Sequence, residues 1–359
     1  MTKKALIIND TSNAYHWGCY GTSSEIKLRL EDLKYEVLLF GVEEVYNLTT
    51  SPKNDKNLFD DGFKNIFLND NIQLVKLIKN SDIIIINGEG SLHNINTSSF
   101  NLLYIIYLAK SHFQKKVHLV NSSLFPSYNK NDVNILSLYS KILSIIDSIT
   151  VRDILSYKQL EFMKLKGTLG FDCLPLYIER KNKLEKHSNN EIILGGGLGL
   201  NEKIFYQLFV SNINLLNEYK LVYLTGARSN EANDDRIFLE IFKNYSGNFE
   251  HKHIENFDEW LISINNAKAL ISGRFHHTIA ASFLDTPTII FSAATPKNHA
   301  LCKMMELSPP LDINNEDIQG LFSKELNLIL DKKHKLLSDK KKKYLKKLSL
   351  NNFSFLNKA

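Results

Sequence analysis

The segment DIIIINGEGSLHN, residues 82–94, joins a run of isoleucines to glycines and polar side chains. A continuous aliphatic run of this length, without alternating polar residues, is typical of a strand covered on both faces of a parallel sheet. Comparable runs occur at residues 5–9, 36–41 and 116–122. The segment therefore predicts a central strand of a parallel sheet, with polar chemistry at the end of that strand.

Helical patterns separate these runs along the chain. Residues 23–33, SSEIKLRLEDL, carry apolar residues on one helical face, and Ser23 or Ser24 is expected to cap the helix start. Residues 99–113, SFNLLYIIYLAKSHF, predict a second helix. Regular alternation of buried strands and helices is a βα repeat, which predicts a Rossmann-like layer.

The alternation pauses at residues 178–191, IERKNKLEKHSNNE, a polar segment without a periodic apolar face. It then resumes, so we expect an α/β protein of two Rossmann-like domains with a cleft between them, the GT-B-like plan. The predicted divisions are an N-terminal domain (1–177), a linker (178–191), a C-terminal domain (192–330), and a basic C-terminal helix and tail (331–359). The strands and helices expected in the second domain are 192–197, 202–219, 220–226, 234–244, 267–271 and 288–291.

Length and composition favour a soluble protein with two filled cores. A chain of 359 residues exceeds most single domains, and its 43% hydrophobic and 23% charged residues are ordinary for globular proteins. No apolar run reaches the roughly 18 residues that a membrane span needs. The start, MTKKALIIND, predicts a first strand rather than a signal peptide, hence a cytoplasmic protein. Cys19, Cys173 and Cys302 form no CxxC pair, which favours a reduced protein without structural zinc.

The net charge is +5, and lysines concentrate in residues 331–348, DKKHKLLSDKKKKYLKKL. Two interpretations of this stretch remain open. It is either a solvated terminal helix or a basic helix that rests on an acidic substrate or on the anionic inner face of the membrane. The basic residues do not alternate with aromatic ones, so we expect no nucleic-acid partner.

Glu89 and His93 directly follow the isoleucine run. Gly88 and Gly90 permit a sharp backbone turn, which would direct both side chains away from the strand end. A carboxylate and an imidazole in this position suit proton transfer. A turn whose Glu and His bond locally to the backbone would have the same sequence, so both interpretations remain open.

Two other strand ends carry weaker signals. In SITVRDILSY, residues 148–157, Asp153 is expected to cap a helix, and Arg152 to pair with it or to hold an anion. In IILGGGLGLNEK, residues 192–203, glycines would let backbone N–H groups approach a phosphate at a helix N-terminus. A glycine-rich turn without a ligand explains this segment as well. Its glycines are Gly195, Gly196, Gly197 and Gly199.

The segment SGRFHHTIAASFLDTPTII, residues 272–290, carries the strongest signal. Gly273 is expected to end a strand, and a helix should begin near His276 or His277. The N-terminus of a helix attracts anions, and the planar guanidinium of Arg274 suits a carboxylate or a phosphate. Imidazoles exchange protons near neutral pH. This group of residues is therefore suited to hold and protonate an anionic substrate.

These strand ends, in this order, resemble the polysaccharide pyruvyl transferase family over residues 1–310. The matching segments are SDIIIINGEGSLHN (81–94), SITVRDILSYKQL (148–160), GFDCLPLYI (170–178) and SGRFHHTIAASFLDTPTII (272–290). Three features differ from the family pattern. Residues 13–25, NAYHWGCYGTSSE, lack the aspartate of the usual N-x-G-D loop; His277 stands where a small residue is common; and Asp172 and Pro175 are not adjacent.

The resemblance implies a GT-B-like enzyme that takes phosphoenolpyruvate as donor. Such an enzyme forms a pyruvate ketal on two hydroxyls of a sugar in a cell-surface polysaccharide or its precursor. The N-terminal domain would bind a lipid-linked, nucleotide-linked or polymeric acceptor, and the C-terminal domain the donor, without another cofactor or a metal. The implied site residues are His276 as acid with Glu89 or His93 as base; Arg274, His277, Arg152, Gly196 and Gly197 for the donor; and His16, Trp17, Ser91 and Asn94 for the acceptor.

Two other functions remain open. A GT-B-like glycosyltransferase that uses a nucleotide-activated sugar, such as a CMP-linked 2-keto acid, would also need Arg274 and His276 for a carboxylate and a phosphate. A scaffolding protein would share the fold without activity, but the joint presence of Glu89 and these two residues argues against it. For an enzyme, we expect Glu89 and His93 to line the same cleft as Arg274, because strand ends carry the ligand edge.

Overall fold

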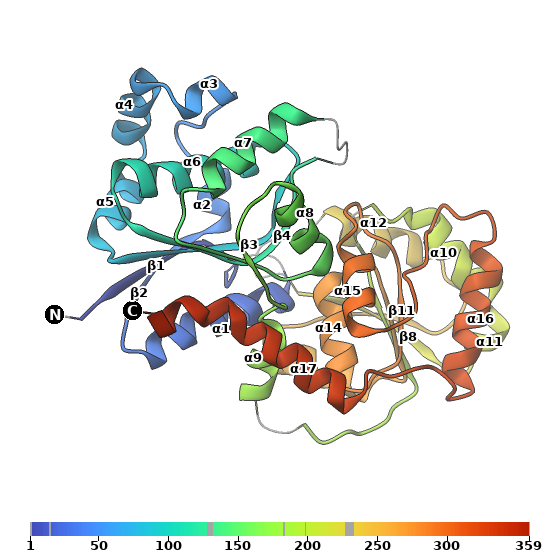
Figure 1. Ribbon diagram of the computed structural model, residues 1–359. Coiled ribbons are helices and arrows are strands. Elements are labelled where there is room, and N and C mark those ends of the chain that lie inside the picture. Colours follow the sequence, from blue (N-terminus) through green and yellow to red (C-terminus); the bar gives the residue numbers. More distant parts are fainter. Residues whose placement is uncertain are drawn as a thin grey trace. The chain divides into compact units, whose positions relative to one another are not determined.

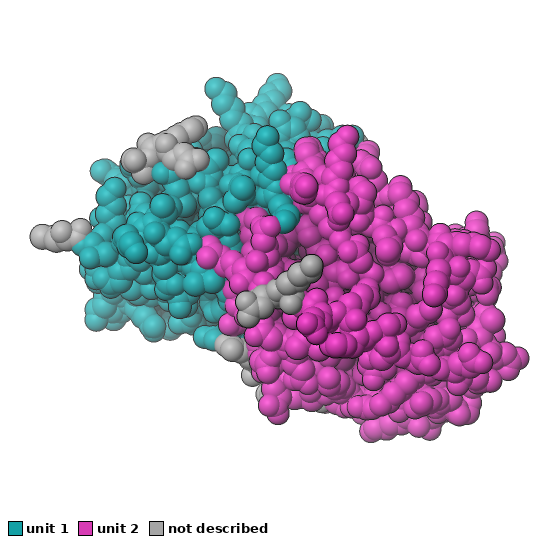
Figure 2. Space-filling view, turned by 90° about the horizontal axis from the view of Figure 1, so that it is seen from below, with its two compact units in different colours: residues 1–14, 22–173, 346–359 teal, residues 15–21, 174–345 magenta. Residues whose placement is uncertain are grey.

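The computed structural model describes residues 2–13, 16–127, 132–181, 184–197, 199–226 and 233–358. Contacts divide the chain into two compact units, which Figure 2 colours teal and magenta. Unit 1 comprises residues 1–14, 22–173 and 346–359, and unit 2 comprises residues 15–21 and 174–345. Each unit has its own parallel sheet and its own hydrophobic core.

A six-stranded parallel sheet forms the centre of unit 1 within the described residues (Figure 1). Its strands are β1 (Lys4–Asp10), β2 (Glu36–Gly41), β3 (Ile83–His93), β4 (Lys116–Phe125), β5 (Ser148–Val151) and β6 (Thr168–Leu169). Their spatial order is β2-β1-β3-β4-β5-β6, so the direction of the connections reverses between β1 and β3. Open α/β sheets bind ligands outside the carboxyl ends of the strands at such a switch point. The ends of β1 and β3 are therefore the expected ligand edge of unit 1.

Helices connect the strands of unit 1 and cover the sheet. The four isoleucines Ile83–Ile86 of β3 are all buried, so both faces of this strand are covered, as the aliphatic run predicts. The helices are α1 (Trp17–Asp32, which begins in unit 2), α2 (Val42–Tyr46), α3 (Asp55–Leu58), α4 (Asp61–Asp70), α5 (Ile72–Asn80), α6 (Thr97–Tyr107), the π-helical turn η1 (Leu108–His112), α7 (Val133–Leu143), α8 (Ile154–Phe162), α17 (Asp339–Leu350, shared with unit 2) and the 3-10 helix η2 (Asn351–Lys358).

The predicted start of the first helix is wrong. Helix α1 already begins at Trp17, and Ser23 and Ser24 lie inside it. The Ser23 hydroxyl accepts hydrogen bonds from the backbone N–H of Thr11 at 2.9 Å and from the side-chain amide of Asn87 at 3.1 Å. Because Thr11 follows β1 and Asn87 belongs to β3, this serine joins two strand ends instead of capping a helix.

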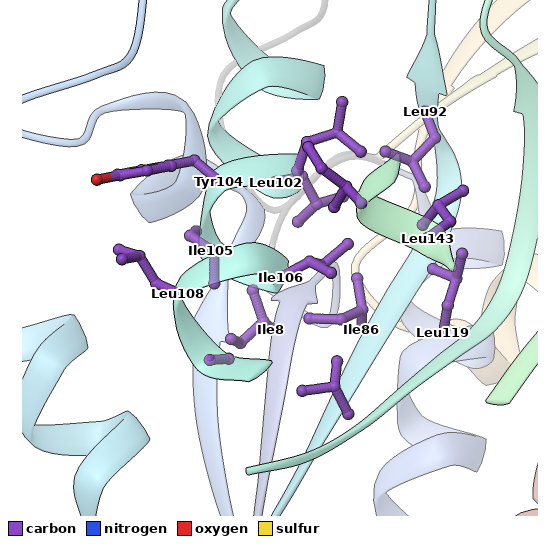
Figure 3. Close-up of a cluster of buried hydrophobic side chains, with 14 of the residues drawn as sticks. Ile8, Ile86, Leu92, Leu102, Tyr104, Ile105, Ile106, Leu108, Leu119 and Leu143 are labelled. Atoms are coloured by element: carbon purple, nitrogen blue, oxygen red, sulfur yellow. The ribbon is translucent and has the colours of Figure 1, made fainter. Parts of the chain in front are cut away.

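The core of unit 1 lies between its sheet and the helices packed on it (Figure 3). Ile8 of β1, Ile86 of β3 and Leu119 of β4 are fully buried in one cluster with Leu102 and Ile106 of α6. Burying an aliphatic side chain of this size contributes about 1.5–3 kcal/mol to stability. The strand ends of unit 1 therefore project from a well-supported sheet.

A five-stranded parallel sheet forms the centre of unit 2 within the described residues. Its strands are β7 (Glu191–Gly195), β8 (Lys220–Thr225), β9 (Phe249–His253), β10 (Ala269–Ser272) and β11 (Thr288–Ile290). Their spatial order is β11-β10-β7-β8-β9, so the switch point lies between β7 and β10. The glycine-rich segment follows β7 and the Arg274 segment follows β10, so both lie at the expected ligand edge.

The helices of unit 2 match most of the predicted helical segments. They are α9 (Leu174–Arg180), α10 (Glu202–Ser211), α11 (Ile213–Leu216), α12 (Asn233–Phe242), α13 (Phe257–Asn266), α14 (Phe275–Phe283), α15 (Lys297–Met305) and α16 (Ile318–Leu330). The single helix expected over residues 202–219 is instead divided between α10 and α11 at Asn212. The Asn212 side chain donates to the Leu208 carbonyl at 2.8 Å, which satisfies a carbonyl at the end of α10.

The two units differ from the predicted divisions at three places. Residues 15–21, which were expected in the N-terminal domain, belong to unit 2. Helix α9 belongs to unit 2, so the chain changes unit after residue 173. Residues 346–359, which were expected to belong to a separate basic tail, are part of unit 1. There Ser349 donates to the carbonyl of Asp172 at 2.7 Å, and Asn352 accepts from the N–H of Asn121 at 2.8 Å.

Two parallel sheets with helical connections confirm the predicted pair of Rossmann-like domains. The cleft expected between them stays a prediction. In the ranges that the structure describes, no helix combines the length and the apolar character needed to cross a bilayer.

Candidate active site

The turn between β10 and α14 presents Arg274 at the start of a helix. Arg274 is the N-cap residue of α14, which begins at Phe275, close to the predicted start. The backbone N–H of Arg274 donates to the Ser272 hydroxyl at 3.0 Å, and the Thr278 hydroxyl donates to the Arg274 carbonyl at 3.2 Å. The backbone of the turn is thus fixed on both sides, with its cation at the positive end of the helix dipole.

A carboxylate of α12 orients the guanidinium of Arg274. Asp235 accepts a hydrogen bond from Nη2 of Arg274 at 2.5 Å and another from the Tyr223 hydroxyl at 2.9 Å. All three side chains are buried. No sequence pattern singles out Asp235, because it lies in a predicted helix with the pattern of an ordinary amphipathic segment.

The first histidine of the pair contacts the start of α1. Nδ1 of His276 lies 3.4 Å from the thiol sulfur of Cys19. A β-carbon at Gly18 would lie 2.2 Å from the β-carbon of His276, so only glycine fits at that position. Both residues of α1 belong to unit 2, and they hold the His276 ring through one of its two nitrogens.

The second histidine is buried against an indole. The Nε1–H of Trp260 donates to Nε2 of His277 at 3.3 Å, and the two rings meet edge to face. Burial lowers the pKa of His277 well below its usual value, and the positive charge of Arg274 and the neighbouring His276 lower it further. His277 is therefore a neutral imidazole near neutral pH.

The glycine-rich segment after β7 packs on the Arg274 turn. A β-carbon at Gly197 would lie 2.8 Å from the α-carbon of Gly273, and one at Gly196 would lie 2.6 Å from the Tyr223 hydroxyl. The Gly196 carbonyl accepts a hydrogen bond from the N–H of Gly273 at 3.1 Å. Helix α10 begins only at Glu202, so these glycines do not open a helix, and close backbone approach is the reason for their small size.

In unit 1, β3 continues through the segment that was predicted to turn. The strand pairs with β4 as far as His93, and its register shifts between Glu89 and Leu92. Glu89 has φ 45°, a left-handed conformation that side chains other than glycine rarely adopt. The predicted sharp turn is therefore wrong: a β-bulge at the strand end re-aims Glu89.

Arg152 lies between two buried carboxylates. Its Nη1 lies 3.0 Å from Glu89 and 2.8 Å from Asp172, and its Nε donates to the Ser123 hydroxyl at 3.0 Å. Burial acts to lower the pKa of Arg152, but the charges of Glu89 and Asp172 outweigh it and raise the pKa. These contacts hold the guanidinium beside Glu89. The expected role of Arg152 in holding the donor stays a prediction.

Asp172, Thr11 and Thr22 complete this buried network. The Thr22 hydroxyl donates to Asp172 at 2.9 Å, and the Thr11 hydroxyl lies 3.4 Å from the second oxygen of Glu89. Asp172 is part of the matching segment GFDCLPLYI, but no sequence pattern identifies a partner for it. As predicted, Asp153 caps α8, because its carboxylate accepts from the N–H of Ser156 at 2.8 Å.

His93 ends β3 in a defined tautomer. Its Nδ1–H donates to the Gly90 carbonyl at 2.6 Å, the local backbone bond that the sequence left open. A neutral His93 then carries its lone pair on Nε2, which suits a base. Nearby, the Ser91 hydroxyl accepts from the Asn9 amide at 3.0 Å. Asn94 is half-buried and directly follows β3, with φ 49°. Ser91 and Asn94, the two expected acceptor residues of this strand, therefore both lie at its carboxyl end.

The other two expected acceptor residues belong to unit 2. The ring of His16 lies 6.3 Å from that of His277, and burial together with the charge of Arg274 lowers the pKa of His16 well below its usual value. Trp17 is buried, and its indole N–H donates to the Ile254 carbonyl at 3.0 Å. The polar atom of Trp17 is thus used in packing unit 2, and its expected role in binding the acceptor stays a prediction.

The predicted residues thus form two groups. Unit 2 brings together His16, Arg274, His276, His277, Gly196 and Gly197, and unit 1 brings together Glu89, Ser91, His93, Asn94 and Arg152. Each group lies at the carboxyl edge of its own sheet. The predicted closeness of Glu89 and His93 to Arg274 joins residues of different units and stays a prediction.

A family model, polysaccharide pyruvyl transferase, matches residues 27–294. The chain belongs to the polysaccharide pyruvyl transferase family. This match covers the strand ends of both units that carry the two groups of residues. It confirms the resemblance seen in the sequence and indicates a transferase of polysaccharide biosynthesis.

Solved structures similar to this pyruvyl transferase family member have the GT-B fold. They include UDP-GlcNAc 2-epimerase from Neisseria meningitidis bound to UDP-GlcNAc (TM-score 0.64, 10% identity, 100% of both chains covered). UDP-GlcNAc 2-epimerase from Methanocaldococcus jannaschii, in complex with UDP-GlcNAc and UDP, has a TM-score of 0.61 and 13% identity, with 99% of this chain and 100% of that chain covered. The glycotransferase of kitacinnamycin has a TM-score of 0.54 and 11% identity, with 100% and 98% covered. At such identities the likeness establishes the GT-B-like fold alone. A search of curated proteins finds no significant match.

Proposed function

We propose that this protein transfers the pyruvyl group of phosphoenolpyruvate to two hydroxyls of one sugar in a cell-surface polysaccharide or its precursor. Family membership supports the general activity. That the donor is phosphoenolpyruvate and that the product is a ketal are the parts that we propose. Unit 2 would bind the donor and unit 1 the sugar, and the reaction would take place on the cytoplasmic side.

The reaction sets the chemical groups that the protein must supply. A proton adds to C3 of phosphoenolpyruvate, which makes C2 electrophilic. The two sugar hydroxyls each form a bond from oxygen to C2 and lose their protons, while the bond from C2 to the phosphate oxygen breaks. One of the two protons balances the one taken up by C3, and the other leaves with hydrogen phosphate. An acid, a base and a fixed cation are therefore required.

Arg274 and His276 suit the donor side of this reaction. The guanidinium of Arg274 is fixed by Asp235 at the N-terminus of α14, where an anion is stabilised by both the cation and the helix dipole. His276 lies two residues further on, and its Nδ1 is held by Cys19. In the proposal, Arg274 holds the carboxylate or the phosphate, and His276 delivers the proton to C3.

His93 and Glu89 suit the acceptor side. The Nδ1–H of His93 is used in its bond to the Gly90 carbonyl, so its Nε2 is the atom that would take a hydroxyl proton. Glu89 is held by Arg152 and would orient a sugar hydroxyl through its carboxylate. In the proposal, His93 is therefore the preferred base of the two residues.

The observation that carries the proposal is the fixed cation and the histidine pair at the switch point of unit 2, in a chain of this family. Thermal unfolding in the presence of phosphoenolpyruvate, CMP, UDP and their sugars tests it. We expect phosphoenolpyruvate alone to raise the midpoint, since a ligand at 100 times its Kd stabilises the folded state by about 2.7 kcal/mol. Arg274→Met should abolish this shift, and Arg236→Met, at an exposed position of α12, should not.

Two results would overturn the proposal. One is stabilisation by a CMP-linked 2-keto acid but not by phosphoenolpyruvate, which would favour the glycosyltransferase alternative. The other is a shift with phosphoenolpyruvate that disappears in EDTA. EDTA should have no effect, because in the proposal Arg274 and the N-terminus of α14 stabilise the negative charge of the donor without a metal or a further cofactor.

A further inference from the structure

His277 has its two ring nitrogens in different surroundings. Its Nε2 accepts the indole N–H of Trp260 at 3.3 Å, and the ring centroids lie 5.2 Å apart at an interplanar angle of 81°. Indole nitrogen is a donor only, so Nε2 must carry the lone pair. A neutral His277 therefore has its proton on Nδ1.

The Nδ1 atom of His277 is a buried donor. It has no hydrogen-bond partner among the residues that the structure describes, although the side chain is only 4% exposed. Nearly all buried polar atoms in native proteins are hydrogen-bonded, so an exception points to a missing partner. The charged and titratable groups beside His277 are Arg274, His276 and His16. Of these, Arg274 carries a permanent positive charge, which favours an anionic partner.

We propose that Trp260 holds His277 as the Nδ1–H tautomer, and that this N–H donates to an anionic oxygen of the donor bound by Arg274. The inference rests on the proposed function for the identity of the donor. His277 would be a binding residue and Trp260 a positioning residue, which acts through the histidine. The anionic oxygen belongs either to the carboxylate or to the phosphate of phosphoenolpyruvate.

The tautomer is measured directly by NMR of ¹⁵N-histidine-labelled protein, with the His277→Asn spectrum to assign the signal. We expect the wild-type protein to show a protonated Nδ1 and an unprotonated Nε2. In Trp260→Phe, which keeps an aromatic ring but removes the indole N–H, both tautomers should appear. Tyr206→Phe is the matched control, because it removes one aromatic donor, to the Asn244 carbonyl at 3.1 Å, elsewhere in unit 2. A protonated Nε2 in the wild type, or an unchanged signal in Trp260→Phe, overturns the assignment.

Two substitutions of His277 test the contact with the donor. An asparagine amide can take the place of Nδ1–H, whereas a glutamine amide reaches toward the Nε2 position. His277→Asn should keep the Kd of phosphoenolpyruvate within about threefold, and His277→Gln should raise it about tenfold, the effect of one charge-assisted hydrogen bond. Trp260→Phe should raise the Kd by a few-fold, while Tyr206→Phe leaves it unchanged. Equal affinities of the Asn and Gln variants overturn the contact.

Separate probes identify the oxygen and separate the two proposals. Inorganic phosphate and pyruvate are each titrated into labelled protein, and the probe that shifts the Nδ1 signal of His277 identifies the group. If neither probe nor phosphoenolpyruvate shifts the signal while a nucleotide sugar does, the proposed function fails but the Trp260 tautomer stands. If phosphoenolpyruvate binds with no change at Nδ1, the proposed function stands and the His277 contact fails.

Discussion

At the scale of single residues, Arg274 and His276 should differ in the kinetic step that each affects. Arg274→Lys keeps a charge but loses the planar group that Asp235 orients, so the Kd of phosphoenolpyruvate should rise by about tenfold. His276→Asn keeps a polar group but loses proton transfer, so kcat should fall by about 10²–10⁴-fold with donor affinity retained. Calorimetric titration and steady-state kinetics separate the two effects. Full activity of His276→Asn would leave Arg274 and the histidines as an anion site only.

The charge of Arg152 should matter for stability more than that of any surface lysine. Arg152→Met leaves Glu89 and Asp172 buried without their cation, so the free energy of unfolding should fall by about 3–5 kcal/mol. The control is Lys64→Met, whose exposed pair with Asp61 should contribute less than about 1 kcal/mol. Urea unfolding measures both. Adding Glu89→Gln to Arg152→Met should recover part of the loss, and a further loss would argue against the buried pairing.

The sequence predicted the cations of the site better than their partners. Arg274 and His276 were found because they stand out between an apolar strand and an apolar helix. Asp235 and Asp172 were missed as partners, since each is a single acidic residue far along the chain from the arginine it contacts. Such pairs form because the fold brings distant elements together, and a local pattern in one sequence does not indicate which elements become neighbours.

At the scale of elements, the glycine-rich segment should be sensitive to one added methyl group. A β-carbon at Gly197 would meet the backbone of Gly273 at 2.8 Å, so Gly197→Ala must displace the Arg274 turn. We expect loss of stability by about 1–3 kcal/mol and weaker donor binding. In Gly62→Ala, at an exposed position of α4, the new methyl group meets only Oδ1 of the N-cap residue Asp60, at 3.1 Å. That control should lose less stability than Gly197→Ala and keep donor binding, and equal effects of the two variants would contradict the close approach.

Buried strands were predicted well, and the ends of elements were not. The continuous aliphatic runs of β1, β3 and β10 are stable only when both faces of the strand are buried. The positions of these strands along the chain therefore follow from the sequence. The bulge at Glu89 and the early start of α1 depend on hydrogen bonds to distant residues such as Thr11. Tertiary contacts of this kind override local propensity at element ends.

The basic helix α17 uses part of its charge in ion pairs with other segments of unit 2. Lys341 pairs with Glu306 and Lys342 pairs with Asp285, each at 2.7 Å. Lys343 and Lys347 are exposed. Lys343 and Lys347 are therefore the residues of α17 that we expect to contact an anionic membrane, and this contact stays a prediction.

At the scale of the whole molecule, stability should fall as the pH is lowered below neutrality. Burial lowers the pKa of His118 to about 4, whereas an unfolded chain titrates near 6.5. As pH falls from about 6.5 to about 4, the unfolded state binds this proton first, so the free energy of unfolding decreases by up to about 1.4 kcal/mol per pH unit. His118→Phe removes the titrating group but keeps a ring against Phe355 of η2. Urea unfolding between pH 7 and 4 should give a smaller slope for this variant, and equal slopes would contradict the shift.

The return of residues 346–359 to unit 1 has a consequence for the order in which a ribosome completes the two domains. Strands β1 to β6 are synthesised first, but the segment that bonds Asn121 and Asp172 emerges only after all of unit 2. Unit 2 therefore has every one of its residues before unit 1 does. During synthesis the N–H of Asn121 and the carbonyl of Asp172 in unit 1 therefore lack these two hydrogen-bond partners until the second domain has left the exit tunnel.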